Sequence, residues 1–190
     1  MYDCLRSAVA KAIGTLKGYT FVTERQQALQ ELGSEKFFDM HRLVYIASEW
    51  WLEGYNKQIA WIAKAAARLG ELIPYGGHER KEVWTTYLPH AIHVARSDGR
   101  LDEIARASLL DRIGRCQASL GQYSAAETTH LQVLSIREVS FGKEDDQTLI
   151  SMNEVGEALT YQGRYEAAYA MHIQTPVSYT HLTLPTNREV

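Results

Sequence analysis

The strongest constraint on the fold is that part of the sequence occurs twice. The segment LLDRIGRCQASLGQYSAAETTHLQ begins at Leu109 and SMNEVGEALTYQGRYEAAYAMHIQ begins at Ser151, so the two copies are offset by 42 residues. Several residues are identical in both copies, namely Gly114 and Gly156, Gly121 and Gly163, Tyr123 and Tyr165, Ala126 and Ala168, and His130 and His172. Repetition at a period of roughly 20–50 residues is typical of folds in which one small unit stacks on the next.

Each copy has the spacing of two helices joined by a short turn. A stripe of residues three and four apart runs along the first helix of each copy: Leu110, Ile113 and Gln117, then Met152, Val155 and Leu159. Gly121 and Gly163 mark the turns between the helices. The loop FGKEDDQT separates the copies, and Asp145 or Asp146 is expected to cap the helix that follows.

Residues 106–175 resemble the tetratricopeptide family, and the long loop and 42-residue period resemble its kinesin-light-chain type. The segment TLISMNEVGEALTYQGRYEAAYAMHIQT is similar to the form common in fungal signalling proteins. Many such repeats have an aromatic residue where this chain has His130 and His172, and we interpret both as packing residues rather than metal ligands. The resemblance implies an α-α superhelix with one full and one truncated repeat that binds a protein or peptide partner.

In repeats of this family the first helix of each unit lines the binding groove. The groove positions expected beside the packing stripe are Asp111, Arg115, Asn153, Glu157 and Tyr161. An amide such as that of Asn153 can donate to and accept from a peptide backbone, and Tyr161 offers a flat apolar surface. The alternative, that these are only solvated helix positions, remains open.

The region before the repeats has a different pattern, and residues 1–57 have the outline of a winged helix. A helix from Cys4 to Leu16 is predicted first, followed by a two-stranded hairpin over residues 19–24 and 36–40. An amphipathic helix from His41 to Gly54 follows, with these residues expected to point inward: Leu43, Ile46, Ala47 and Trp50. Residues 58–105 are predicted to be a helical connector in which Pro89 begins a helix.

The stretch FDMHRLV places a histidine at the junction of the second strand and this helix. A lone histidine at such a place commonly caps or packs the junction. The stretch also resembles the winged-helix segment of NB-ARC-type signalling ATPases, with GTLKGYTFVTE before it and VWTTYLPHA after it similar to fungal members. That resemblance implies that Met40 and His41 form the Met-His motif, whose histidine contacts the β-phosphate of ADP. Arg42 stands where the motif has Asp.

Several functions are excluded or disfavoured by the sequence. No GxxxxGK[ST] phosphate loop occurs, so the chain is not expected to be an ATPase, and ADP or ATP is expected only in a parent protein with a nucleotide-binding domain. No residues have the spacing of a catalytic pair or a metal site. The net charge of -3 and pI near 6.2 give no case for nucleic acid or anionic membrane, and no apolar run reaches the ~20 residues of a membrane span.

These observations predict a mainly α-helical, non-catalytic interaction and regulatory fragment of an NB-ARC-type protein in the cytoplasm, with self-association in the parent. The helical period stops at Pro176, so residues 176–190 are expected to be a non-native or disordered tail. The alternative is a free-standing adaptor similar to kinesin light chain. A phosphate-loop domain encoded upstream of Met1 would distinguish the two.

Overall fold

Helices dominate the computed structural model, which describes residues 2–24, 38–73, 81–97 and 100–174. The only sheet within these ranges is a two-stranded hairpin, which confirms the mainly helical class. The chain divides into two units, Met1–Ile59 and Ala60–Val190. The expected division into residues 1–57, 58–105 and 106–175 stays a prediction, and the expected tail, residues 176–190, lies outside the described residues.

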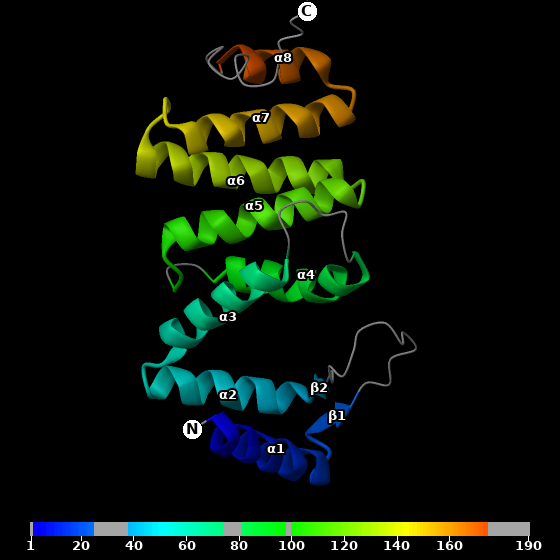
Figure 1. Ribbon diagram of the computed structural model, residues 1–190, viewed down its shortest axis with the longest axis vertical. Coiled ribbons are helices and arrows are strands. Elements are labelled where there is room, and N and C mark those ends of the chain that lie inside the picture. Colours follow the sequence, from blue (N-terminus) through cyan, green and yellow to red (C-terminus); the bar gives the residue numbers. More distant parts are fainter. Residues whose placement is uncertain (1, 25–37, 74–80, 98–99, 175–190) are drawn as a thin grey trace, which may run out of the picture. The chain divides into compact units, whose positions relative to one another are not determined.

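The first unit contains a helix, a hairpin and a second helix (Figure 1). These elements are α1 (Tyr2–Gly18), β1 (Val22–Glu24), β2 (Phe38–Met40) and α2 (Arg42–Gly54). The strands are antiparallel, with Val22 opposite Met40 and Glu24 opposite Phe38. Val22 is the only hydrophobic residue described in this unit that is buried.

The predicted hairpin is confirmed, but its first strand, β1, is shorter than expected. Residues 19–21 complete the end of α1, because the N–H groups of Thr20 and Phe21 donate to the carbonyl oxygens of Lys17 and Leu16 at 3.0 Å. Thr20 has φ of 57°, a left-handed conformation that does not continue a strand. Residues 36–37 lie outside the described residues.

The predicted inward face of α2 is wrong in this structure. Leu43 is 67% exposed and Trp50 is 73% exposed, Ala47 is also exposed, and Ile46 is half-buried. No residue of α2 is buried. The physical reason is that two three-residue strands offer too little surface to cover a helix of 13 residues.

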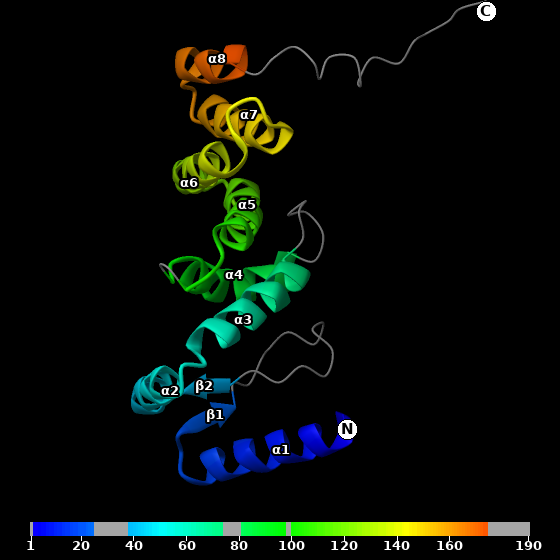
Figure 2. The same cartoon turned by 90° about the vertical axis from the view of Figure 1, so that its left-hand side faces the viewer.

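The second unit is a series of helices in which each packs on the next. They are α3 (Gln58–Leu72), which starts at the boundary, α4 (Lys81–Ala95), α5 (Glu103–Ser119), α6 (Tyr123–Phe141), α7 (Asp146–Tyr161) and α8 (Tyr165–Gln174). Figure 2 shows α5, α6, α7 and α8 following one another in that order. The largest core cluster combines Leu69, Trp84, Leu88 and Ala91 with Ile113 and other residues of α5 and α6.

Turns and caps in the repeats follow the sequence signals. Gly121 and Gly163 have φ of 75° and 76°, as a glycine turn after a helix requires. The Asp145 side chain accepts a hydrogen bond from the Gln147 N–H at 2.9 Å and caps α7. Both expectations are confirmed.

Two arginines of α5 join the preceding helices to the repeats. The Arg112 Nη1 donates to the Ile73 carbonyl at 2.6 Å, just after α3, and the Arg106 Nε donates to the Ala95 carbonyl at 3.0 Å, at the end of α4. The last carbonyls of a helix lack partners within the helix, and a cation there also meets the negative end of the helix dipole. Helices α3 and α4 are therefore part of the same packed unit as α5.

Pro89 does not begin a helix as expected but lies inside α4. A proline at such a position removes one backbone hydrogen bond, at a cost of about 3 kcal/mol or more. Trp84 and Ala91 are both fully buried and Leu88 is nearly so, and they lie three and four residues apart on one face of the helix. Burial of a large apolar side chain such as that of Trp84 or Leu88 contributes about 1.5–3 kcal/mol, which offsets the loss of the hydrogen bond.

Candidate interaction site on the repeats

The interface between α5, α6 and α7 contains a buried ionic network. The Asp111 carboxylate, 3% exposed, accepts from the Arg137 Nη2 at 3.1 Å. Arg137 Nη1 donates to the Ser151 Oγ at 2.7 Å and to the Gln147 carbonyl at 3.2 Å. The expectation that Asp111 is an exposed groove residue is therefore wrong, because the buried guanidinium of α6 requires a counter-charge from α5.

Arg115 lies at the edge of this network and crosses to the second repeat. Its Nη2 is 2.7 Å from the Glu154 Oε1, and its Nε donates to the Asp111 Oδ1 at 3.4 Å. Burial raises the pKa of Glu154, and the positive charge of Arg115 opposes that shift. Arg115 is thus a half-buried link between α5 and α7.

His130 packs in this interface against the face of Gly114. It is 1% exposed, and a Cβ at Gly114 would lie 2.6 Å from both its Cε1 and its Nε2. Its Nδ1 is 3.9 Å from the Asp111 Oδ1 and its Nε2 is 3.8 Å from the Glu154 Oε2, too far for hydrogen bonds. Burial lowers the pKa of His130 to about 4, so the ring is neutral at pH 7.

The same arrangement recurs one repeat later. A Cβ at Gly156 would lie 2.6 Å from the Cε1 of His172, which is half-buried. The interpretation of both histidines as packing residues is confirmed by these contacts. No group of three His, Cys, Asp or Glu side chains that could hold a metal is found among the described residues.

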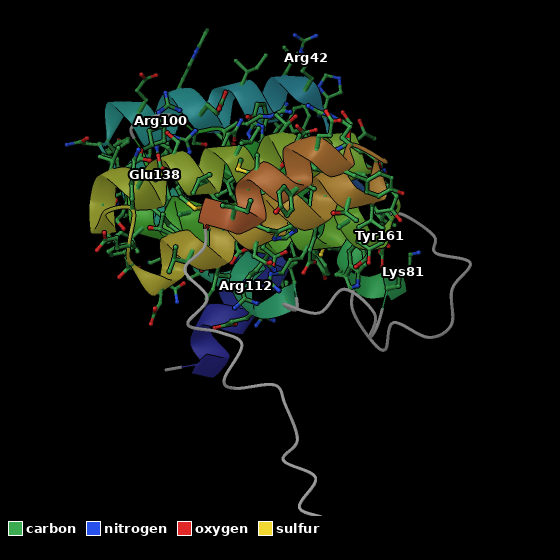
Figure 3. The ribbon with its side chains drawn as sticks, turned by 90° about the horizontal axis from the view of Figure 1, so that it is seen from above. Arg42, Lys81, Arg100, Arg112, Glu138 and Tyr161 are labelled. Carbon is green, nitrogen blue, oxygen red and sulfur yellow. The ribbon has the colours of Figure 1, made fainter. Side chains whose placement is uncertain are left out.

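The remaining predicted groove residues form a line along α7 at intervals of four residues. The Asn153 Nδ2 donates to the Glu157 Oε1 at 3.0 Å, and Glu157 is exposed. Tyr161 is 64% exposed and its ring is stacked on that of Tyr123, with centroids 4.9 Å apart (Tyr161 is labelled in Figure 3). The structure thus brings Asn153, Glu157 and Tyr161 to one face of α7, with Arg115 beside Glu154.

His41 occupies the junction between β2 and α2. It is the N-cap of α2, and its Nδ1 accepts from the Leu43 N–H at 3.2 Å. Because the Nδ1 accepts, the neutral ring carries its proton on Nε2. Met40 lies in β2 and is 52% exposed. The local capping role of His41 is therefore observed, and contact with a nucleotide stays a prediction.

The sequence analysis missed Arg137 and Glu154. Arg137 follows Ala126, His130 and Val133 on the buried stripe of α6, and an arginine on such a stripe requires an acidic partner. That signal was present in the sequence. The sequence contains no such signal for Glu154, because only the packing of α5 beside α7 brings this residue close to Arg115.

Comparison with known proteins agrees with the repeat geometry. Residues 103–174 match the tetratricopeptide repeat family, and this part of the chain consists of tetratricopeptide-type helical repeats. The chain is also 30% identical over 145 residues to a protein of Hyaloscypha variabilis described as "Nucleotide-binding leucine-rich repeat (NLR)-like protein". The match covers 75% of this chain but 14% of that protein. No solved structure matches the chain.

Repeats that stack in this way commonly present extended surfaces to protein partners. No helix in the described ranges has the length and hydrophobicity needed to cross a membrane.

Proposed function

We propose that the exposed face of α7 binds an extended segment of a protein partner. The observation that carries this proposal is the line formed by Asn153, Glu157 and Tyr161 on a helix whose opposite side is fixed in a packed core. Asn153 and Glu157 offer donors and acceptors to a peptide backbone, and Tyr161 offers an aromatic surface already held in place by Tyr123.

A double substitution tests the face without disturbing the core. Asn153→Ala with Tyr161→Ala is expected to lose the partner in a pull-down with the longer parent protein. The matched control is Ser135→Ala with Val139→Ala, two exposed residues of α6, which is expected to keep it. Melting temperatures of both variants verify folding. Equal recovery of the partner by the two variants would remove this face of α7 from the interaction.

The first unit has a separate proposed role in a parent that contains a nucleotide-binding domain of the NB-ARC type. There the winged-helix-like segment senses the nucleotide, and the parent self-associates when it signals. The relative described as NLR-like supports this reading, since the matched region is a small part of that protein. His41 supports it too, because its Nε2–H lies at the N-terminus of α2, where the helix dipole favours a phosphate.

Two substitutions of His41 separate capping from nucleotide contact. Asparagine is a good N-cap but lacks the imidazole, so His41→Asn is expected to keep α2 and release ADP faster in the parent. His41→Ala is expected to release ADP equally fast and also to weaken α2. If His41→Asn retains ADP as well as the unchanged parent does, the residue acts only as a cap.

The alternative function is a free-standing adaptor similar to kinesin light chain. It is supported by the repeats alone and requires no role for Met40 and His41. Sequencing of the transcript upstream of the codon for Met1 distinguishes it, because an adaptor has no phosphate-loop domain there.

A further inference from the structure

A cavity of about 520 Å³ lies between α4, α5 and α6. Ile92, Leu110 and Ile113 form an apolar part of its wall, and Arg96, Gln117 and Thr129 belong to its polar part. None of the described residues that line it is acidic, although the whole chain has a net charge of -3. The volume lies within the range of roughly 300–1,000 Å³ that is usual for ligand sites.

The cavity is on a different side of α5 from Asp111 and Arg115, the residues that connect α5 to α6 and to the α7 helix of the proposed partner-binding face. At about 100° per residue, Leu110, Ile113 and Gln117 share one side of the helix. Asp111 and Arg115 lie on roughly the opposite side, where they contact α6 and α7. The proposal below is therefore independent of the function proposed for α7.

The internal repeat shows that the cavity departs from the packing used elsewhere in the chain. One repeat later, Leu159 takes the place of Gln117 and Met171 takes the place of Thr129. Met171 packs against Leu134 and Met152 in one cluster and against Leu159 in another. In the first repeat the Thr129 Oγ1 instead donates to the Gln117 Oε1 at 2.8 Å. The first repeat therefore has a hydrogen-bonded polar pair beside the cavity, where the second repeat has two apolar side chains.

Arg96 supplies a positive charge at this cavity. It is exposed, and among the described residues no carboxylate pairs with its guanidinium. Arg106, which also lines the cavity, is engaged with the Ala95 carbonyl and with Glu103. A planar guanidinium matches a carboxylate with two parallel hydrogen bonds.

We propose that this cavity binds a short acidic segment of a partner protein. One aliphatic side chain of that segment enters the space beside Ile92, Leu110 and Ile113, and an adjacent carboxylate pairs with Arg96. Charge complementarity selects the carboxylate. The Gln132 amide, which is exposed in the wall, can donate to and accept from the backbone of a peptide.

Fluorescence anisotropy with the full chain tests the chemistry of the ligand. The probe is a short fluorescent peptide with blocked ends and a Glu-Leu-Glu centre. It is expected to bind saturably, and peptides with Gln-Leu-Gln or Glu-Gly-Glu centres are expected to bind about 10-fold more weakly or worse. Absence of saturation up to about 1 mM peptide, a concentration at which even weak specific binding is visible, would overturn the proposal. So would displacement of the probe by an equimolar amount of isocaproate, which would assign the cavity to small acids.

Two protein variants test the site. Arg96→Ala is expected to weaken binding about 10-fold, and Lys143→Ala, which removes an exposed charge that does not line the cavity, is expected to leave it unchanged. An equal effect of both would mean that only net charge matters.

The second variant fills the cavity with the side chains of the next repeat. Gln117→Leu with Thr129→Met removes both members of a polar pair together, which is commonly neutral or stabilising. This variant is expected to melt at or above the temperature of the unchanged chain and to bind the peptide at least about 10-fold more weakly. Undiminished binding by the folded variant would show that the cavity is not the site.

Discussion

Gly114→Ala is a sharp test of the packing between α5 and α6. The added methyl group would lie 2.6 Å from two ring atoms of His130, and His130 is 1% exposed. The ring has no room to withdraw, because Asp111 and Glu154 lie on either side of it. Overpacking of this kind costs about 1–3 kcal/mol, while replacement of a helical glycine by alanine returns about 0.5–1 kcal/mol. The two ranges together give a net loss of up to about 2.5 kcal/mol, with a middle value of roughly 1 kcal/mol.

The internal repeat provides the matched control. Gly156→Ala brings its methyl group equally close to His172, but His172 is half-buried near the end of α8, so it is less tightly enclosed than His130. We expect a change within about 0.5 kcal/mol, or a small gain from helix propensity. For a chain of this size, 1 kcal/mol corresponds to about 2–4 °C in melting temperature.

Urea unfolding followed by circular dichroism measures both variants. A double-mutant cycle with His130→Ala isolates the contact, because Gly114→Ala in that background meets no ring and is expected to be neutral or stabilising. Equal unfolding midpoints for Gly114→Ala and Gly156→Ala, or a Gly114→Ala effect that persists without the imidazole, would refute the packing argument.

Three further predictions follow from the buried groups. Asp111→Ala leaves the Arg137 guanidinium buried without its counter-charge and is expected to cost about 3–5 kcal/mol in urea unfolding; a cost below about 1 kcal/mol, as for a surface pair, would contradict the network. The pKa of His130 is lowered from 6.5 to about 4, so the unfolded state binds a proton at a higher pH than the folded state does. The contribution of the neutral ring to the free energy of unfolding is therefore complete above about pH 6.5 and is lost as the pH falls toward 4. Because the raised pKa of Glu154 acts in the opposite direction, the measurement is the difference in pH dependence between the unchanged chain and His130→Gln, and identical profiles would contradict the assignment. Cys116 is fully buried, and burial raises the pKa of its thiol to about 11. After treatment with a thiol reagent at pH 8, mass mapping is therefore expected to find Cys116 modified only in denaturant. Rapid labelling of the native chain would show that the thiol is accessible.

Local signals in the sequence predicted the repeats well. Glycines at equal offsets located the two turns, and the acidic loop located the cap of α7. The pairing of Gly114 with His130 follows the same repetition, since a glycine and a bulky residue recur together at the same offset. Such signals depend on neighbours within one helix or one turn, which is why a single sequence carries them.

Features that depend on packing between helices were not predicted. Asp111 has the sequence position of a groove residue, and only the approach of Arg137 from α6 explains its burial. The inward stripe of α2 was read from periodicity, but periodicity states that a face is apolar and not that another element covers it. Pro89 was predicted to begin a helix because the sequence shows the cost of a proline inside a helix. It does not show the burial of Trp84 and Ala91 against other helices, which offsets that cost.

The buried valine of the first unit has a practical consequence for biochemical work. Val22 is the only hydrophobic residue described there that is buried, and its burial contributes about 1.5–3 kcal/mol, against about 1–2 kcal/mol of backbone entropy for every residue held in place. Opening of the described part of the first unit around Val22 and α2 should therefore be frequent on the time scale of protease digestion, while the helices from α5 to α8 open rarely. In a trypsin time course the N-terminal fragment is then the first to disappear, and a partner that slows its disappearance is a ligand of the first unit.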